Sequence, residues 1–177
     1  MMRIGLSSTD RGAFLRAMCR VANSVVVVTT DDTAGYNGAT VSAFSSVSGE
    51  PPMVLVSLSS GNRIAEAIAA NGTVCVNVLP HDRSNLVNRF AGRDDRVKGD
   101  RFQGVDLMDA AGAIPEIGGA MVFAGGVDQA VPAGSHSNFI RRVQSVFQGL
   151  AAPLAYFVGG YHKVVPQVTF RQNTATA

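Results

Sequence analysis

The segment with the clearest chemical character consists mostly of small and hydroxyl-bearing residues. It runs from Gly38 to Ser48, and it is followed by Pro51-Pro52 and by the apolar run 53–58. Small side chains let a flat ligand approach the backbone, so that main-chain N–H groups and Ser or Thr hydroxyls can bond its polar edge. An ordinary half-exposed strand has a similar composition. The segment therefore indicates a ligand cradle or a plain strand, and its neighbours decide between the two.

A second candidate site follows directly after the apolar run. Here Ser59, Ser60, Gly61, Asn62 and Arg63 precede a predicted helix. The N-terminus of a helix carries partial positive charge, and Arg63 adds a full one, so the junction suits an anionic phosphate. Plain capping of the helix by Asn62 accounts for the same residues. The two features together favour one site for a flat, phosphate-bearing ligand.

A histidine and an aromatic segment are the remaining candidates. His136 follows a Gly-Ser turn and could donate to a ligand amide or phosphate, although a surface histidine needs no such role. The segment from Tyr156 to Tyr161 could wall a flat ligand or pack in the core. The three histidines lack metal-ligand spacing, so no metal site is predicted. Dinucleotide, phosphate-loop and nucleophile-elbow motifs are also missing from the sequence.

Composition indicates a single domain with a surface unusually poor in charge. The chain has 177 residues, of which 46% are hydrophobic and 16% charged. An average domain has about 25% charged residues. Coverage of part of the surface by a second subunit would explain the difference, and so would a compact monomer rich in Ala and Gly.

Charge and hydropathy exclude two classes of partner. A net charge of +2, spread over scattered Lys and Arg residues, predicts no nucleic-acid binding. No apolar run reaches the about 18 residues of a membrane span, and the N-terminus does not look like a secretory leader. We therefore expect a cytoplasmic protein that does not bind membranes. Cys19 and Cys75 lie in apolar patterns without paired spacing, which predicts buried, reduced thiols.

Three helices are expected to position these residues. Asp10 can cap a helix with Phe14, Leu15 and Met18 at helical spacing, and Ala22 continues that stripe. The second helix covers 63–70 and stops at Asn71-Gly72. The third follows His81, with Asp82 as its cap and an apolar face that includes Phe90.

The rest of the chain reads mainly as strands. Turn residues 31–35 make the Gly38 segment the returning strand of a hairpin. Strand composition marks the ranges 24–30, 53–58, 73–79, 120–131 and 154–165, while 92–104 reads as a surface loop. The range 137–147 fits both a helix and a strand, and its periodicity favours a helix. These elements predict an antiparallel barrel with peripheral helices.

The order of these features resembles the flavin reductase-like domain family. Its members are FMN-binding split barrels, among them the reductase components of two-component flavin monooxygenases and the related corrinoid reductases. The likeness spans roughly residues 14–164. It is carried by six ordered motifs, namely 40–48 with Pro51-Pro52, Val76-Asn77-Val78-Leu79, Arg89-Phe90-Ala91-Gly92-Arg93, Gly99-Asp100-Arg101-Phe102, Gly134-Ser135-His136 and 156–161.

The resemblance implies a mainly β fold, an antiparallel split β-barrel with short peripheral α-helices. It makes 137–147 a strand, against its periodicity. We expect one flavin reductase-like domain over 1–177, with its core at 10–165 and mobile tails at 1–8 and 167–177. The implied activity is hydride transfer from NADH or NADPH to FMN or FAD. A homodimer that supplies reduced flavin to a monooxygenase is the implied assembly.

The resemblance also assigns roles to individual residues. The segment from Thr40 to Ser46 would line the ring and ribityl chain, and Asn62 and Arg63 would meet the phosphate. His136, the one residue assigned to catalysis, would help Tyr161 to hold the nicotinamide nucleotide against the flavin. The full set of implied cofactor-binding residues is Thr40, Val41, Ser42, Ala43, Ser45, Ser46, Ser59, Asn62, Arg63, Phe90, Ala91, His136 and Tyr161.

Two departures from the family pattern bear on this assignment. Gly134-Ser135-His136 stands where many members have Gly-Asp-His, so a contribution from that aspartate is missing. Ala22-Asn23-Ser24 stands where many have Ala-Thr-Gly, which affects the local turn.

Three other functions fit parts of the sequence. A flavoenzyme could reduce a bound substrate such as a corrinoid, and a split barrel could bind flavin or haem without turnover. A dimeric scaffold without catalysis is the third. Consumption of NADH or NADPH with added flavin separates an enzyme from a binding module. Dependence of that rate on a corrinoid separates the two enzymes.

Overall fold

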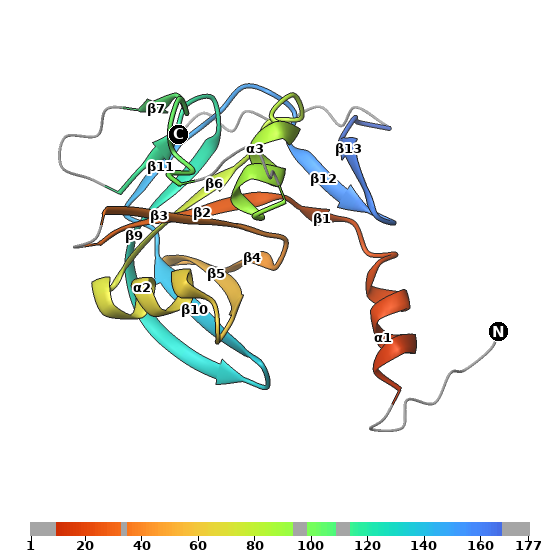
Figure 1. Ribbon diagram of the computed structural model, residues 1–177, viewed down its shortest axis with the longest axis horizontal. Helices are drawn as coiled ribbons and strands as arrows, with labels where there is room; N and C mark the ends of the chain where they lie inside the picture. Colours follow the sequence, from red (N-terminus) through yellow and green to blue (C-terminus); the bar gives the residue numbers. More distant parts are fainter. Residues whose placement is uncertain (1–9, 33–34, 94–98, 109–113, 168–177) are drawn as a thin grey trace.

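The computed structural model describes residues 10–32, 35–93, 99–108 and 114–167 (Figure 1). Strands dominate this part of the chain, and the prediction of a mainly β fold is confirmed. The tails predicted to be mobile lie outside the described residues, apart from Gln167. Figure 1 shows the strands gathered into one body, with one short helix on each side of it.

An eight-stranded antiparallel sheet forms the body. Seven of its strands follow the spatial order β3-β2-β6-β9-β10-β5-β4, and the eighth, β11, pairs with β9. Their bounds are β2 (Val26–Asp32), β3 (Gly35–Val41), β4 (Phe44–Gly49), β5 (Pro52–Ser59), β6 (Thr73–Val78), β9 (Met121–Ala133), β10 (His136–Arg142) and β11 (Ser145–Phe147). Strands β3 and β4 stand at opposite ends of this order although only Ser42 and Ala43 separate them in sequence. The sheet therefore curls into a barrel that stays split at this corner, as the resemblance implied.

The predicted hairpin strand beginning at Gly38 is correct only as far as Val41. Up to that residue it pairs with β2, from Val26 opposite Val41 onward. After the corner, Phe44 pairs with Val56 of β5 instead. The small-residue segment thus contributes to both edge strands of the sheet, β3 and β4.

Two small sheets complete the strand content. In one, β12 (Leu154–Phe157) lies between β1 (Asn23–Ser24) and β13 (Gly160–Lys163), and in the other β7 (Leu107–Met108) pairs with β8 (Glu116–Ile117). The predicted strand 154–165 is therefore a hairpin. Its two-residue turn places Val158 at φ 46° and Gly159 at φ 79°. Turns of this type favour Asn-Gly, and a β-branched residue at positive φ is strained.

Strand β2 is covered on both faces, which explains its unbroken apolar sequence. Val26 and Val28 belong to a core beneath α2 (Arg63–Asn71). Val27, together with the preceding Val25, belongs to a second core beneath α3 (Ser84–Phe90). A strand buried on both faces has no polar alternation to show in its sequence.

The range 137–147 forms β10 and β11, as the resemblance implied and against its helical periodicity. Phe139 and Arg141 alternate toward the interior of the barrel. The guanidinium of Arg141 is fully buried and donates hydrogen bonds to the carbonyls of Val74 and Phe123. Burial lowers the pKa of Arg141 to about 10. Because this buried position holds a charged residue, the hydrophobic pattern of 137–147 does not show the alternation of a strand.

Of the caps predicted for α2 and α3, one is correct and one is wrong. Asn62 caps α2, because its side chain accepts from the N–H of Ile64 at 3.4 Å, and Gly72 ends the helix at φ 66°. The cap predicted at Asp82 is wrong. Helix α3 begins at Ser84, and Arg83 occupies its N-cap position without a side-chain hydrogen bond.

The N-terminal helix α1 (Arg11–Met18) forms as predicted but buries nothing. Asp10 caps it by accepting from the N–H of Ala13 at 2.9 Å. The helix ends before Ala22, and Phe14, Leu15 and Met18 are all exposed. Figure 1 shows α1 extending away from the strands. Its apolar stripe has no partner among the described residues.

The two cysteines differ. Cys75 is buried as predicted, and its burial raises the pKa of the thiol to about 12. Cys19 follows the exposed helix α1 and is itself exposed, so the prediction of a buried thiol is wrong there.

No helix within the described ranges is long and apolar enough to cross a membrane. The described residues also contain no group of three or more His, Cys, Asp or Glu side chains placed to hold a metal ion. The cytoplasmic location stays a prediction.

The predicted loop at 92–104 is irregular in its described parts, but it is anchored to the barrel. Phe102 is buried against Phe90, with ring centroids 5.0 Å apart. Both rings lie beneath Gly38, where a Cβ would come within 2.9–3.0 Å of their side chains. Absence of a side chain at Gly38 therefore lets β3 lie close to α3.

Candidate active site

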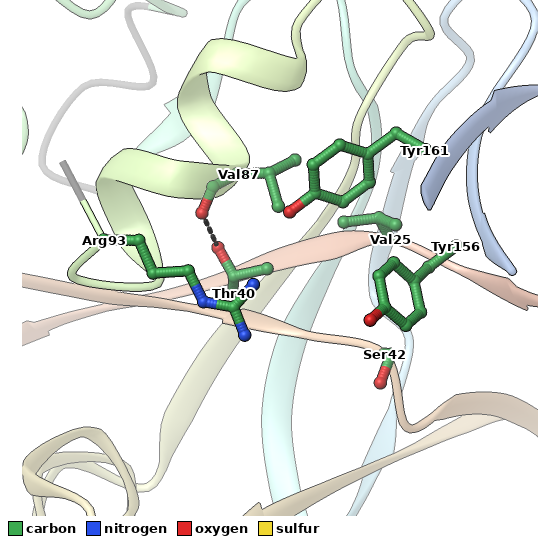
Figure 2. Close-up of a pocket in the computed structure, with 7 residues that line it drawn as sticks. All are labelled: Val25, Thr40, Ser42, Val87, Arg93, Tyr156 and Tyr161. Atoms are coloured by element: carbon green, nitrogen blue, oxygen red, sulfur yellow. Dashed lines mark hydrogen bonds between the residues drawn. The ribbon is translucent and has the colours of Figure 1, made fainter. Parts of the chain in front are cut away.

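A pocket of about 190 Å³ opens where the end of β3, helix α3 and the β12–β13 hairpin meet (Figure 2). Its walls combine aromatic, aliphatic and hydroxyl side chains with one cation. The lining residues are Val25, Thr40, Ser42, Val87, Arg93, Tyr156 and Tyr161. Aromatic and aliphatic walls with several polar groups suit a small molecule that has both a flat apolar face and a polar edge.

Two tyrosines form one wall of the pocket. Tyr156 and Tyr161 are paired across the β12–β13 hairpin, with ring centroids 5.8 Å apart. The hydroxyl of Tyr161 donates to Oδ1 of Asn88 on α3 at 3.3 Å, which ties the hairpin to that helix. Aromatic walls of this kind can stack on a flat ring.

The opposite wall is the end of β3. Thr40 Oγ1 donates to the carbonyl of Val87 at 2.8 Å, and Figure 2 shows this bond between the strand and α3. The Thr40 hydroxyl proton is therefore committed to the protein. Ser42 is exposed at the corner and keeps its hydroxyl at the mouth of the pocket.

The junction between β5 and α2, residues Ser59–Arg63, is a second polar site. Ser59 lies opposite His136 on β10, and Ser60 donates its N–H to the carbonyl of Ser135 at 3.1 Å. Ser135 Oγ and His136 Nδ1 are 3.0 Å apart. Gly61, Asn62 and Arg63 are exposed at the start of α2, where the Asn62 side chain accepts from the N–H of Ile64. An exposed helix start with adjacent cationic and hydroxyl groups suits a phosphate.

Strand register places the split corner between the pocket and the junction. The N–H of Ser57 donates to the carbonyl of Ala43 at 3.0 Å, two residues before Ser59 along β5. Ser42, which precedes Ala43, lines the pocket. One elongated ligand could therefore extend from the pocket, across the corner, to the junction.

The predicted site residues separate into three groups. Thr40, Ser42 and Tyr161 line the pocket, Ala43 forms the corner, and Ser59, Asn62, Arg63 and His136 meet at the junction. Val41 and Phe90 are 7% and 1% exposed, so their side chains face the core. Ser45 and Ser46 lie beyond the corner on β4, and Ala91 follows the end of α3. None of these last five residues lines the pocket.

Val25, Val87 and Arg93 were not predicted to bind a ligand, while Tyr156 belonged to the segment expected to wall a flat ligand but was not assigned as a binding residue. Val25 lies between β1 and β2, Val87 on α3 and Tyr156 on β12, and Arg93 follows α3. Tyr156 had a usable signal, because a hairpin turn at Val158-Gly159 pairs it with Tyr161. Arg93 lay within a motif already noted, but sequence does not show which way a residue after a helix points.

Comparison with known proteins agrees with this geometry. The family model for the flavin reductase like domain matches residues 18–164. The FMN reductase (NADH) RutF of Variovorax paradoxus is 36% identical over 155 residues, which cover 85% of this chain and 84% of that protein. Among solved structures, the flavin reductase PheA2 in its native state has a TM-score of 0.81 and 32% identity, covering 89% of this chain and all of that chain. The styrene monooxygenase flavin reductase SMOB from Pseudomonas putida S12 has a TM-score of 0.77 and 28% identity, over 88% and 99% of the two chains. The chain belongs to the flavin reductase-like domain family.

Proposed function

We propose that this protein is an NADH-dependent FMN reductase. The observation that carries the proposal is the continuous arrangement of an aromatic pocket, a small-residue corner and a phosphate-ready junction. The three parts have the character required by the three parts of FMN, which are a flat ring, a polar chain and a terminal phosphate. The relative in Variovorax paradoxus is named an FMN reductase (NADH), which supports the choice of FMN and NADH.

The residues present fit FMN in their chemistry. Tyr156 and Tyr161 offer aromatic faces to the ring, and Ser42 offers a hydroxyl where the ring joins its chain. Asn62 and Arg63 lie at the positive end of the α2 dipole, where we propose that the phosphate binds. When bound, FMN supplies the redox chemistry by accepting a hydride from the nicotinamide. The protein then needs to hold two rings at a near-attack distance of about 3–3.5 Å.

His136 has a more limited role in this proposal. It lies opposite Ser59 at the junction and is exposed, while the aromatic wall is at the pocket. We propose that it binds the nucleotide chain or phosphate of a substrate by donating a hydrogen bond, and that it takes no part in proton transfer. His136→Ala should therefore raise the KM for NADH or FMN more than it lowers kcat.

A monooxygenase is the proposed recipient of the reduced flavin. The structural neighbour SMOB is named as the flavin reductase of styrene monooxygenase. The pocket has a mouth at the exposed Ser42, so a product can leave by diffusion. Transfer of reduced FMN to a purified flavin-dependent monooxygenase, followed as oxidation of that enzyme's substrate, tests this role.

We propose further that the protein is a homodimer. The side chains of Phe14, Leu15 and Met18 are 50%, 44% and 43% exposed. They lie on helix α1, which extends away from the body. Exposed apolar stripes of this kind are usually covered by a partner, and a second copy is the proposed one. Light scattering after size exclusion should give twice the mass of the chain. A mass of one chain would contradict the dimer and leave the activity untouched.

Anaerobic reduction of added FMN by NADH tests the function. Loss of flavin absorbance together with NADH, at one flavin per NADH, is the expected result. NADPH and FAD run in parallel identify the preferred nucleotides. FMN binding without turnover would instead indicate a binding module, and turnover that requires a corrinoid would indicate a reductase of a bound substrate. Absence of FMN binding would overturn the proposal.

A further inference from the structure

Arg93 is the one charged side chain among the described residues that line the pocket. Figure 2 shows its guanidinium extending from the end of α3 toward Thr40, opposite the tyrosine wall. The remaining lining residues are apolar, aromatic or hydroxyl-bearing. Arg93 is itself exposed, so a ligand that enters the pocket can reach its guanidinium. A ligand that covers this cation reduces its screening by water and strengthens its interaction with a charge on the ligand.

The backbone of Arg93 is fixed by the end of α3. Gly92 has φ 69° and donates its N–H to the carbonyl of Arg89 at 3.2 Å. Arg93 donates its own N–H to the carbonyl of Asn88 at 2.9 Å. These two bonds form a Schellman cap, which holds the residue after the glycine in one direction. The side chain of Asn88 accepts from Tyr161, so Asn88 contacts both the backbone of Arg93 and the aromatic wall.

The proposed reaction creates a negative charge that this cation can meet. A hydride carries two electrons and one proton, so its transfer from NADH to the neutral oxidised ring of FMN gives NAD⁺ and a reduced ring that carries one negative charge. That charge resides on the pyrimidine edge of the ring. A positive group beside this edge stabilises the product and removes the need for a protein acid.

We propose that Arg93 binds the pyrimidine edge of the flavin and makes the site prefer the reduced, anionic form. This inference rests on the proposed function, and it adds the orientation of the ring, with the pyrimidine edge toward α3. Thr40 is held by Val87 and does not compete for the same contact. Arg93 thus determines which redox state the site holds more tightly, while Arg63 acts on the phosphate in both states.

The test compares dissociation constants for oxidised and reduced FMN under anaerobic conditions, in the wild type and in three variants. Arg93→Gln removes the charge, Arg93→Lys keeps it, and Arg83→Gln removes a charge at the other end of α3. Wild type and Arg83→Gln should bind reduced FMN about threefold to tenfold more tightly than oxidised FMN, as expected for a charge pair that forms when the ligand covers the exposed Arg93. Arg93→Gln should bring the two constants within about twofold, and Arg93→Lys should keep most of the preference.

The two-electron potential of bound FMN gives an independent readout, because it must shift by the same ratio of constants. An unchanged ratio in Arg93→Gln would overturn the inference. Wild-type protein that reduces FMN with NADH but shows equal affinity for both redox states would also overturn it, with the proposed function intact. Wild-type protein that binds neither form would instead overturn the proposed function.

Discussion

The pocket and the junction, two parts of one proposed site, are built in opposite ways. The junction consists mainly of consecutive residues, Ser59–Arg63, at a strand-to-helix transition. The pocket collects side chains from β3, α3, β12 and the segments beside them, which lie up to 136 residues apart between Val25 and Tyr161. A contiguous site is fixed by local capping and can be recognised locally. A dispersed site depends on the packing of the whole barrel, so its residues are harder to find and its integrity depends on the core.

Phe90→Ala should produce the largest change in unfolding free energy. It tests whether the pocket depends on the core, as the comparison with the junction implies. Phe90 is buried behind β3, and removal of a buried aromatic ring costs about 3–5 kcal/mol of unfolding free energy. Chemical denaturation measures this loss. Phe147→Ala, at an exposed phenylalanine, serves as the control and should cost under about 1 kcal/mol. Unchanged stability with lost FMN binding would show that Phe90 contacts the ligand, as the resemblance implied.

Arg63→Gln separates the junction from the pocket. Loss of a charge-assisted contact to phosphate should weaken FMN binding by about tenfold, or about 1.4 kcal/mol. Riboflavin has the same ring but lacks the phosphate, so its affinity should not change. Fluorescence titration with both ligands makes the measurement. Arg16→Gln on the exposed helix α1 is the matched control. Equal losses for FMN and riboflavin would mean that Arg63 does not act on the phosphate.

Tyr156→Ala tests the pocket in the same titration. Loss of an aromatic contact costs about 0.5–1.5 kcal/mol, so FMN and riboflavin should both bind about two- to tenfold more weakly. Tyr161→Phe keeps the ring and removes the bond to Asn88, and it should have a smaller effect. If Tyr156→Ala weakened the binding of FMN but not of riboflavin, the proposal that the flavin ring lies in the pocket would be contradicted.

Val158→Asn should give the smallest effect, in the opposite direction. Asparagine tolerates positive φ better than a β-branched residue, so the hairpin turn should gain about 0.5–1 kcal/mol. A rise in Tm measures the gain. Val165→Asn, an exposed position after the hairpin, should leave Tm nearly unchanged. A fall in Tm for Val158→Asn would show that the valine side chain supports the hairpin.

Most of the fold could be predicted from the sequence, because local signals coincide with tertiary packing. The cap at Asn62, the glycine stop at Gly72 and the two-sided strand β2 all have direct sequence counterparts. The range 137–147 is different, since Arg141 occupies a core position where a hydrophobic pattern expects an apolar residue. Only the resemblance identified it as a strand.

The candidate site was predicted less completely than the fold. Thr40 and Ser42 were found because they belong to a contiguous small-residue segment. Val41 was included for the same reason, although alternation along β3 turns its side chain into the core. Arg93 was missed as a binding residue because its direction depends on the helix cap at Gly92. Position along the chain thus indicated the neighbourhood, while side-chain direction required the structure.

The β12–β13 hairpin is the wall of the pocket best suited to sequence variation. Its tyrosines belong to a small sheet whose strands do not pair with the eight-stranded barrel, and Tyr161 is hydrogen-bonded to Asn88 on α3. Substitutions in this hairpin can therefore reshape one wall of the pocket without altering the strand order that supports the other. A protein engineer seeking to accept a differently substituted flat ring has a natural place to vary the sequence there. Divergence among descendants of one ancestral barrel could proceed by the same route.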